Sequence, residues 1–149
     1  MTENKGSFLA RVGAVAGLGL GLVLAAGSAA GASVGIAAAT PVITVAPATG
    51  LADGAVVTVA GTGLTAGGVY HVGQCAAVLA NAYACNYATA IDITANRGGS
   101  ARTSLTVSSS FVGNAADGSS WTVDCKVSTC VIGVYNDAFE GGAVPLSFS

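Results

Sequence analysis

The chain has 149 residues, of which 52% are hydrophobic and 8% are charged, and its net charge at neutral pH is −2. Beyond residue 39 it carries three Lys or Arg against six Asp or Glu, which gives a net charge of −3. So few cations cannot neutralise many phosphates, and direct affinity for nucleic acid depends on that neutralisation. The composition therefore argues against tight binding of DNA by the protein surface itself.

The N-terminal segment has the features of an export signal. Two basic residues, Lys5 and Arg11, precede the apolar stretch Val12–Leu24, which leads into small residues ending at Ala39. This stretch is short for crossing about 30 Å of hydrocarbon, and small residues suit signal peptidase. We expect a secretory signal peptide over residues 1–39, cleaved near Ala39. An uncleaved membrane anchor is the alternative, since a Gly- and Ala-rich stretch could cross a bilayer at a tilt.

Cleavage would leave residues 40–149, which is 110 residues. This length suits one domain with a single two-layer core. No cysteine precedes Cys75, so the cleavage site offers none for lipid attachment. We expect a secreted, extracellular, monomeric protein without stable membrane association.

From residue 40 the sequence consists of short runs of Val, Ile, Thr and Tyr separated by Gly, Asp and Asn. Such runs, repeating about every 8 to 12 residues, are typical of β-sandwiches and barrels. The predicted strands are 42–45, 55–60, 69–75, 83–85, 90–95, 101–107, 121–125, 131–135 and 144–148. No stretch of the mature chain keeps a 3.6-residue apolar stripe over three turns. The prediction is an all-β, antiparallel fold without helix.

Four cysteines in a short exported chain predict disulfides rather than a zinc site. Three pairings are possible. Cys125 and Cys130 enclose four residues, and Cys75 and Cys85 enclose a glycine-free loop, so pairing between sequence neighbours is favoured. The spacing from Cys75 to Cys85 is too wide for a usual four-cysteine zinc site.

The mature sequence holds little material for catalysis. Nucleophilic hydrolysis needs a base and a group that orients it, and His71 is the chain's one histidine. The acidic residues stand singly beside Gly, Asn or Ser, where they commonly bond to turn backbone. A copper site would need further histidines with a Cys or Met. We therefore expect no enzyme activity, no metal and no resident cofactor.

Alternation along 69–75 places His71, Gly73 and Cys75 on one face of a strand and Tyr70 and Val72 on the other. Two interpretations of His71 stay open. It is a solvated histidine on an open sheet face, or it belongs to a cleft wall where Gly73 leaves the backbone bare for a flat ligand.

The aromatic side chains divide into two groups. We expect three of them in the core: Phe111, Trp121 and Phe148. Three others stand in hairpin or loop contexts, where a ligand could meet them: Tyr83, Tyr87 and Tyr135.

Several separate motifs follow one another in the mature chain. They are PATGLADG at 47–54, VGQCA at 72–76 followed by Cys85-Asn86, SLTV at 104–107 with Ser110-Phe111, and Asp117-Gly118 before VDC at 123–125. Together with both cysteine spacings, this order resembles the neocarzinostatin family of enediyne antitumour antibiotic apoproteins. The resemblance covers essentially the whole mature chain.

The resemblance implies a seven-stranded immunoglobulin-like antiparallel β-sandwich with a small two-stranded ribbon and a ligand cleft between them. It also implies an antibiotic carrier that non-covalently binds, stabilises and shields a DNA-damaging enediyne chromophore. DNA would be attacked by that ligand, so the protein would meet DNA only indirectly. Carried over by position, the cleft lining comprises His71, Gly73, Cys75, Ala77, Tyr83, Cys85, Ala90, Asn114, Ala116, Val131 and Tyr135.

The chain departs from the family pattern where members present large aromatic residues. Ala77, Ala90, Asn114 and Ala116 stand at such positions. Each lost aromatic removes about 150 to 250 Å² of possible contact, so we expect a wider cleft with weaker stacking. A different small molecule, or a structural or adhesion role without a chromophore, remains the alternative.

Overall fold

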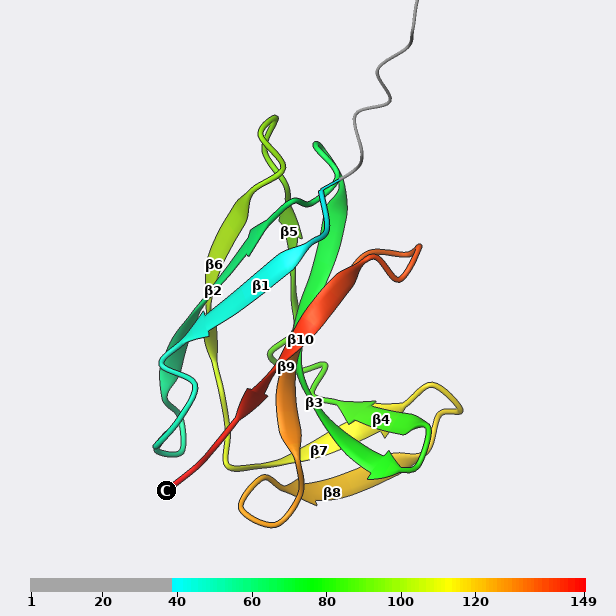
Figure 1. Cartoon of the computed structure of the whole chain (residues 1–149). Helices are drawn as coiled ribbons and strands as arrows, with labels where there is room; N and C mark the ends of the chain where they lie inside the picture. Colours follow the sequence, from blue (N-terminus) through cyan, green and yellow to red (C-terminus); the bar gives the residue numbers. More distant parts are fainter. Residues whose placement is uncertain (1–38) are drawn as a thin grey trace, which may run out of the picture. The chain divides into compact units, whose positions relative to one another are not determined.

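The computed structural model describes residues 39–149, and within this range the chain forms ten β-strands and no helix (Figure 1). The predicted export signal lies outside the described residues, apart from its last residue, Ala39. The all-β, antiparallel fold predicted from the sequence is confirmed. The strands are β1 (Val42–Ala46), β2 (Val56–Thr62), β3 (Val69–Leu79), β4 (Ala82–Cys85), β5 (Ile91–Thr94), β6 (Ala101–Thr106), β7 (Ser110–Ala115), β8 (Ser120–Asp124), β9 (Cys130–Tyr135) and β10 (Gly141–Leu146).

Two layers of strands enclose the larger of two cores. One layer is the three-stranded sheet β1-β2-β6, and the other is the part of a seven-stranded sheet formed by β10, β9, β3 and β5. Side chains alternate across each strand, so Val57 and Val59 of β2 share one buried cluster with Tyr70 and Val72 of β3. These seven strands make up the predicted sandwich.

The longest strand, β3, runs through both parts of the domain. Its first residues pair with β5, its middle pairs with β9, and its end pairs with β4 as a hairpin. Beyond the sandwich, β4 also pairs with β7, and β7 with β8. The predicted two-stranded ribbon is thus joined to the β7–β8 hairpin, and together they form a smaller part with its own core.

This smaller core contains one of the expected core aromatics, Phe111, and two others, Trp121 and Phe148, pack against it. The remaining buried members are Ala76, Ala84, Val123, Cys125 and Cys130.

The sequence pattern does not predict β7, because Gly113 and Asn114 are poor strand formers. The structure shows why a glycine stands there. A Cβ on Gly113 would lie 2.9 Å from the Cβ of Ala84 and 3.0 Å from the ring of Phe111. The close approach of β7 to β4 requires glycine, and packing overrides the weak strand propensity.

Both predicted disulfides are present. Cys75–Cys85 joins β3 to β4, and Cys125–Cys130 closes the connection between β8 and β9. The two bridges lie on opposite faces of the sheet, since Cys75 and Cys85 are partly exposed whereas Cys125 and Cys130 are buried in the smaller core. One bridge therefore supports the core and the other contributes to the outer surface.

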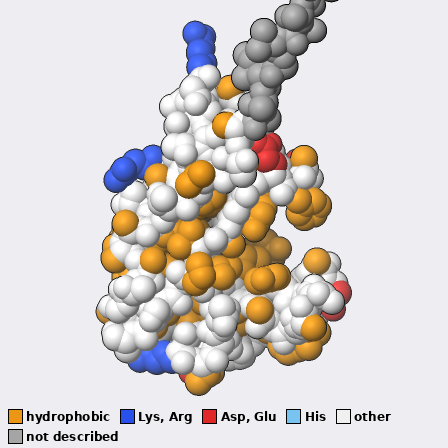
Figure 2. Space-filling view, viewed as in Figure 1, with side chains coloured by type: hydrophobic (Ala, Val, Ile, Leu, Met, Phe, Trp, Pro, Cys, Tyr) orange, Lys and Arg blue, Asp and Glu red, His pale blue; other side chains and the backbone are white. Residues whose placement is uncertain are grey.

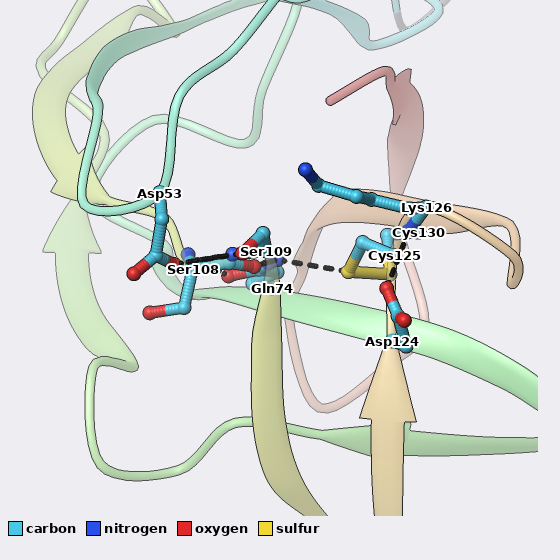
Figure 3. Close-up of a disulfide and its surroundings, with 8 residues drawn as sticks. All are labelled: Asp53, Gln74, Ser108, Ser109, Asp124, Cys125, Lys126 and Cys130. Atoms are coloured by element: carbon cyan, nitrogen blue, oxygen red, sulfur yellow. Dashed lines mark hydrogen bonds between the residues drawn. A yellow bond between two sulfur atoms is a disulfide. The ribbon is translucent and has the colours of Figure 1, made fainter. Parts of the chain in front are cut away.

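A buried amide, Gln74, ties the two parts together (Figure 3). Its Oε1 accepts a hydrogen bond from the N–H of Ser108 at 2.9 Å, and its Nε2 donates to the Ser108 carbonyl at 2.6 Å. Ser108 lies between β6 of the sandwich and β7 of the smaller part. The next residue, Ser109, donates its N–H to Oδ1 of Asp53 at 2.7 Å. The chain segment that links the two parts is therefore fixed from both sides.

Replacing Gln74 with Leu keeps a similar side-chain volume but removes both partners of the Ser108 backbone. We expect the free energy of unfolding to fall by about 2 kcal/mol or more, because each buried group left without a partner costs about 1 to 3 kcal/mol. Denaturant unfolding followed by Trp121 emission measures the loss. The control is Thr122→Leu on the exposed face of β8, for which we expect a change within about 0.5 kcal/mol. A Gln74→Leu protein as stable as its parent would contradict this role.

Candidate ligand-binding cleft

A cavity of about 710 Å³ opens on the face of the seven-stranded sheet that points away from the three-stranded sheet. Figure 2 shows a hollow with apolar side chains on its floor, between the β9–β10 loop and the β3–β4 hairpin. A volume of this size suits a drug-sized small molecule. The lining residues are His71, Val72, Gly73, Cys75, Tyr83, Cys85, Tyr87, Ala90, Val131, Gly133, Tyr135, Asn136, Asp137, Phe139 and Ala143.

Eight of the eleven residues expected in the cleft line this cavity: His71, Gly73, Cys75, Tyr83, Cys85, Ala90, Val131 and Tyr135. Cross-strand pairing explains how they come together, because directly opposed residues of two strands point to the same face. Three such pairs join β3 to β9 on this face: His71–Tyr135, Gly73–Gly133 and Cys75–Val131.

The other three expected residues, Ala77, Asn114 and Ala116, lie outside the cavity lining. Ala77 is paired with Tyr83, and Asn114 with Cys85, so both stand on the same face of the sheet as the cavity. Ala116 is exposed in the turn between β7 and β8. Ala77 and Asn114 thus extend this face of the sheet beyond the cavity.

Seven lining residues lie outside the eleven carried over by position: Val72, Tyr87, Gly133, Asn136, Asp137, Phe139 and Ala143. Among these, Tyr87 was expected from its context as an aromatic residue that a ligand could meet. Gly133 could have been found from the sequence, because a glycine inside a predicted strand often marks a place where a ligand or another backbone segment approaches closely. Asn136, Asp137 and Phe139 belong to a loop, and no periodic pattern in the sequence indicates which surface that loop covers.

Small apolar residues form the floor of the cavity, whereas aromatic residues form its rim. Gly73 and Gly133 lie side by side, and a Cβ on Gly73 would lie 3.6 Å from the Cβ of Ala90. Four exposed aromatic residues line the same cavity: Tyr83, Tyr87, Tyr135 and Phe139. Exposed aromatic rings around an apolar hollow are typical of binding sites. The arrangement can hold a flat apolar molecule on bare backbone with rings at its edges.

His71 is the polar element of the cleft wall. Its Nδ1 lies 2.7 Å from Oδ1 of Asp92, and its Nε2 lies 3.1 Å from Oδ1 of Asp137. The hydrogen bond with Asp92 first, and the one with Asp137 second, raise the pKa of His71 above its ordinary 6.5. A carboxylate only accepts, so protonated His71 can donate from both ring nitrogens to these two partners. His71 lines the cavity while its side chain stays 55% exposed.

No three or more His, Cys, Asp or Glu side chains within residues 39–149 are grouped so that they could hold a metal ion. No helix of this part of the chain is long and apolar enough to cross a membrane.

We expect Asp92→Asn to lower the pKa of His71 more than Asp137→Asn does, because the bond with Asp92 is the larger cause of the shift. NMR titration measures this directly, since the chain has one histidine. Because the pKa of His71 is higher in the folded protein than in the unfolded chain, protonated His71 stabilises the fold. This stabilisation is fully present when the pH is below the pKa of the unfolded chain, and it is lost as the pH rises through the pKa of the folded protein. Melting temperatures of the parent should decline over that interval and stay flatter in Asp92→Asn. A His71 pKa at or below 6.5 would contradict the double contact.

Comparisons with known proteins all point to the same family. Residues 43–148 match the model of the neocarzinostatin family. The chain is 42% identical to macromomycin of Streptomyces macromomyceticus over the whole of both chains. It is 38% identical to the antitumor antibiotic C-1027 apoprotein of Streptomyces globisporus, over 93% of this chain and 92% of that protein.

Two solved structures share the fold. Macromomycin superposes with a TM-score of 0.71 at 47% identity, over 74% of this chain and 100% of that one. Apokedarcidin superposes with a TM-score of 0.61 at 37% identity, with the same coverage. Sequence identity and fold agree across the described part of the chain, and the chain belongs to the neocarzinostatin family.

Proposed function

We propose that the mature protein is a secreted apoprotein that non-covalently binds, stabilises and carries a DNA-damaging enediyne chromophore in this cleft. The observation that carries the proposal is the pre-formed apolar cavity of about 710 Å³, ringed by exposed aromatic residues, on the family's fold. One relative is named an antitumor antibiotic apoprotein, which supports a role in holding a non-protein partner.

The protein's task in this proposal is shielding and not chemistry. An enediyne ring is poised to cyclise to a diradical that abstracts hydrogen from DNA sugar. An apolar floor lowers the exposure of such a ring to water and thiols once the ring lies against it. Both ring nitrogens of His71 are engaged by Asp92 and Asp137, an arrangement that fits a wall residue better than a catalytic base.

Delivery follows from the same properties. Export through residues 1–39 and release near Ala39 would place a monomeric carrier outside the cell. With a net charge of −3 beyond residue 39, the protein surface has too few cations to hold DNA tightly by itself. DNA is therefore attacked by the ligand after it leaves the cleft.

Titration with prodan, a neutral and flat naphthalene ketone whose emission shifts to the blue in apolar surroundings, tests the cleft directly. We expect saturable one-to-one binding with a blue shift, and quenching of tyrosine emission from the rim. Absence of saturable binding by prodan and by other flat aromatic molecules would contradict the proposal and favour a structural or adhesion role.

Gly73→Trp should abolish or strongly weaken prodan binding. A Cβ on Gly73 would meet only the Cβ of Ala90, at 3.6 Å, so the indole can extend into the cavity and occupy the space of the ligand. We expect a loss of affinity of at least roughly tenfold, equivalent to about 1.4 kcal/mol. The matched control is Val112→Trp, which places the same side chain on exposed β7 outside the cavity lining. Equal affinity in Gly73→Trp and the parent would place the binding site elsewhere.

Ala77→Trp should have the opposite effect. Ala77 is exposed and paired with Tyr83, so a new ring extends the aromatic rim without overpacking a core. Stacking on one added ring is worth about 0.5 to 1.5 kcal/mol, which is roughly a three- to tenfold gain in affinity. Calorimetric titration measures the gain, and a thermal melt of the ligand-free variant checks that stability is kept. Unchanged affinity together with unchanged stability would show that Ala77 does not border the ligand.

A further inference from the structure

Phe139 is a large aromatic residue in an unusual backbone conformation. Its φ is 58°, and within residues 39–149 it is the one non-glycine residue with a positive φ. Glycine and, less often, Asn or Asp normally occupy this left-handed region. The side chain is 87% exposed, so packing within the free protein does not account for the choice of Phe. A residue that is both strained and exposed points to a role in binding.

Hydrogen bonds fix the backbone of the loop that carries this residue. Oδ1 of Asn136 accepts from the N–H of Ala138 at 3.0 Å and from the N–H of Glu140 at 2.9 Å. The N–H of Phe139 donates to the Asn136 carbonyl at 2.9 Å, and the N–H of Asn136 donates to the Glu140 carbonyl at 3.0 Å. The left-handed conformation at Phe139 is therefore imposed by its neighbours.

Two contacts outside the loop hold it at the edge of the cavity. Oδ1 of Asp137 lies 3.1 Å from Nε2 of His71, which is itself a lining residue. The hydroxyl of Thr65 contacts both carboxylate oxygens of Glu140, at 2.8 and 3.1 Å. Phe139 thus lines the cavity from a loop whose backbone these hydrogen bonds hold in place.

Two of the other three rim aromatics, Tyr83 and Tyr87, lie on the other side of the floor, whereas Tyr135 ends β9 and lies on the same side as Phe139. Tyr83 belongs to β4 and Tyr87 follows it, whereas Phe139 follows β9, and β4 and β9 flank β3 on opposite sides. A flat molecule resting on Gly73 and Gly133 presents its second face to solvent, because the sheet covers only the first. A ring held on the loop side can cover that outward face.

We propose that Phe139 is a ligand-contacting residue whose ring stacks on the outward face of the flat, conjugated part of the bound chromophore. It screens this part from solvent and slows its release. The inference rests on the proposed function and adds to it a residue that determines how long the ligand stays bound. Phe139 would favour ligands that present a planar unsaturated surface to the β9–β10 loop.

The test compares Phe139→Gly and Phe139→Asn with Phe139→Tyr, using prodan as the probe. Gly and Asn accept the left-handed conformation, so the melting temperature should be unchanged or raised. The dissociation rate of prodan, measured by stopped-flow displacement, should rise roughly three- to tenfold in both variants. Quenching of bound prodan by acrylamide should rise in parallel. Phe139→Tyr keeps the ring and should match the parent in both measurements.

The outcomes separate this inference from the proposed function. If the parent binds prodan and the Gly and Asn variants release it at the parent's rate with unchanged quenching, the role of Phe139 is overturned and the carrier function stands. If the parent binds neither prodan nor other flat aromatic molecules, the failure lies with the proposed function. A lower melting temperature in Phe139→Gly, with unchanged release from Phe139→Asn, would assign the ring a purely structural role and would also overturn the inference.

Discussion

The alternation of side chains along β3 is the constraint on which both the core and the cleft depend. Successive residues of a strand point to opposite faces, so burying Tyr70 and Val72 in the sandwich places His71 and Gly73 on the outer face. A slip of one residue would turn both sets to the wrong side. The register is secured because β3 pairs with three strands, β4, β5 and β9.

The cleft lies where the two parts of the domain meet, so its width depends on how they are joined. One side belongs to the β3–β4 hairpin of the smaller part, and the other belongs to the β9–β10 loop of the sandwich. On the buried face, between the cleft residues Gly73 and Cys75, Gln74 satisfies both backbone groups of Ser108 in the connecting segment. A disulfide reinforces each face of this junction. A rigid junction keeps the cavity open without a ligand, which lowers the entropy cost of binding.

In this cleft the aromatic side chains stand at the edges, and the floor carries none of them. Ala77, Ala90 and Ala116 are small where the family resemblance leads one to expect aromatic residues. Ala90 lies beside Gly73, so no large side chain rises from this part of the floor. The aromatic area comes instead from the edges, through three tyrosines and Phe139. Such a site favours a ligand that is flat against the sheet and bordered by rings.

The sequence by itself determined the features that depend on local periodicity and spacing. Alternation assigned His71, Gly73 and Cys75 to one face, and short separations between cysteines favoured the two disulfides that the structure contains. Tertiary structure alone decided the rest. β7 exists because Gly113 lets it approach Ala84 from a distant part of the chain, and the limits of the cavity, which omit Ala77 and include Phe139, depend on where hairpins and loops close over the sheet. Contacts between residues far apart in sequence decide these features, and no local pattern carries that information.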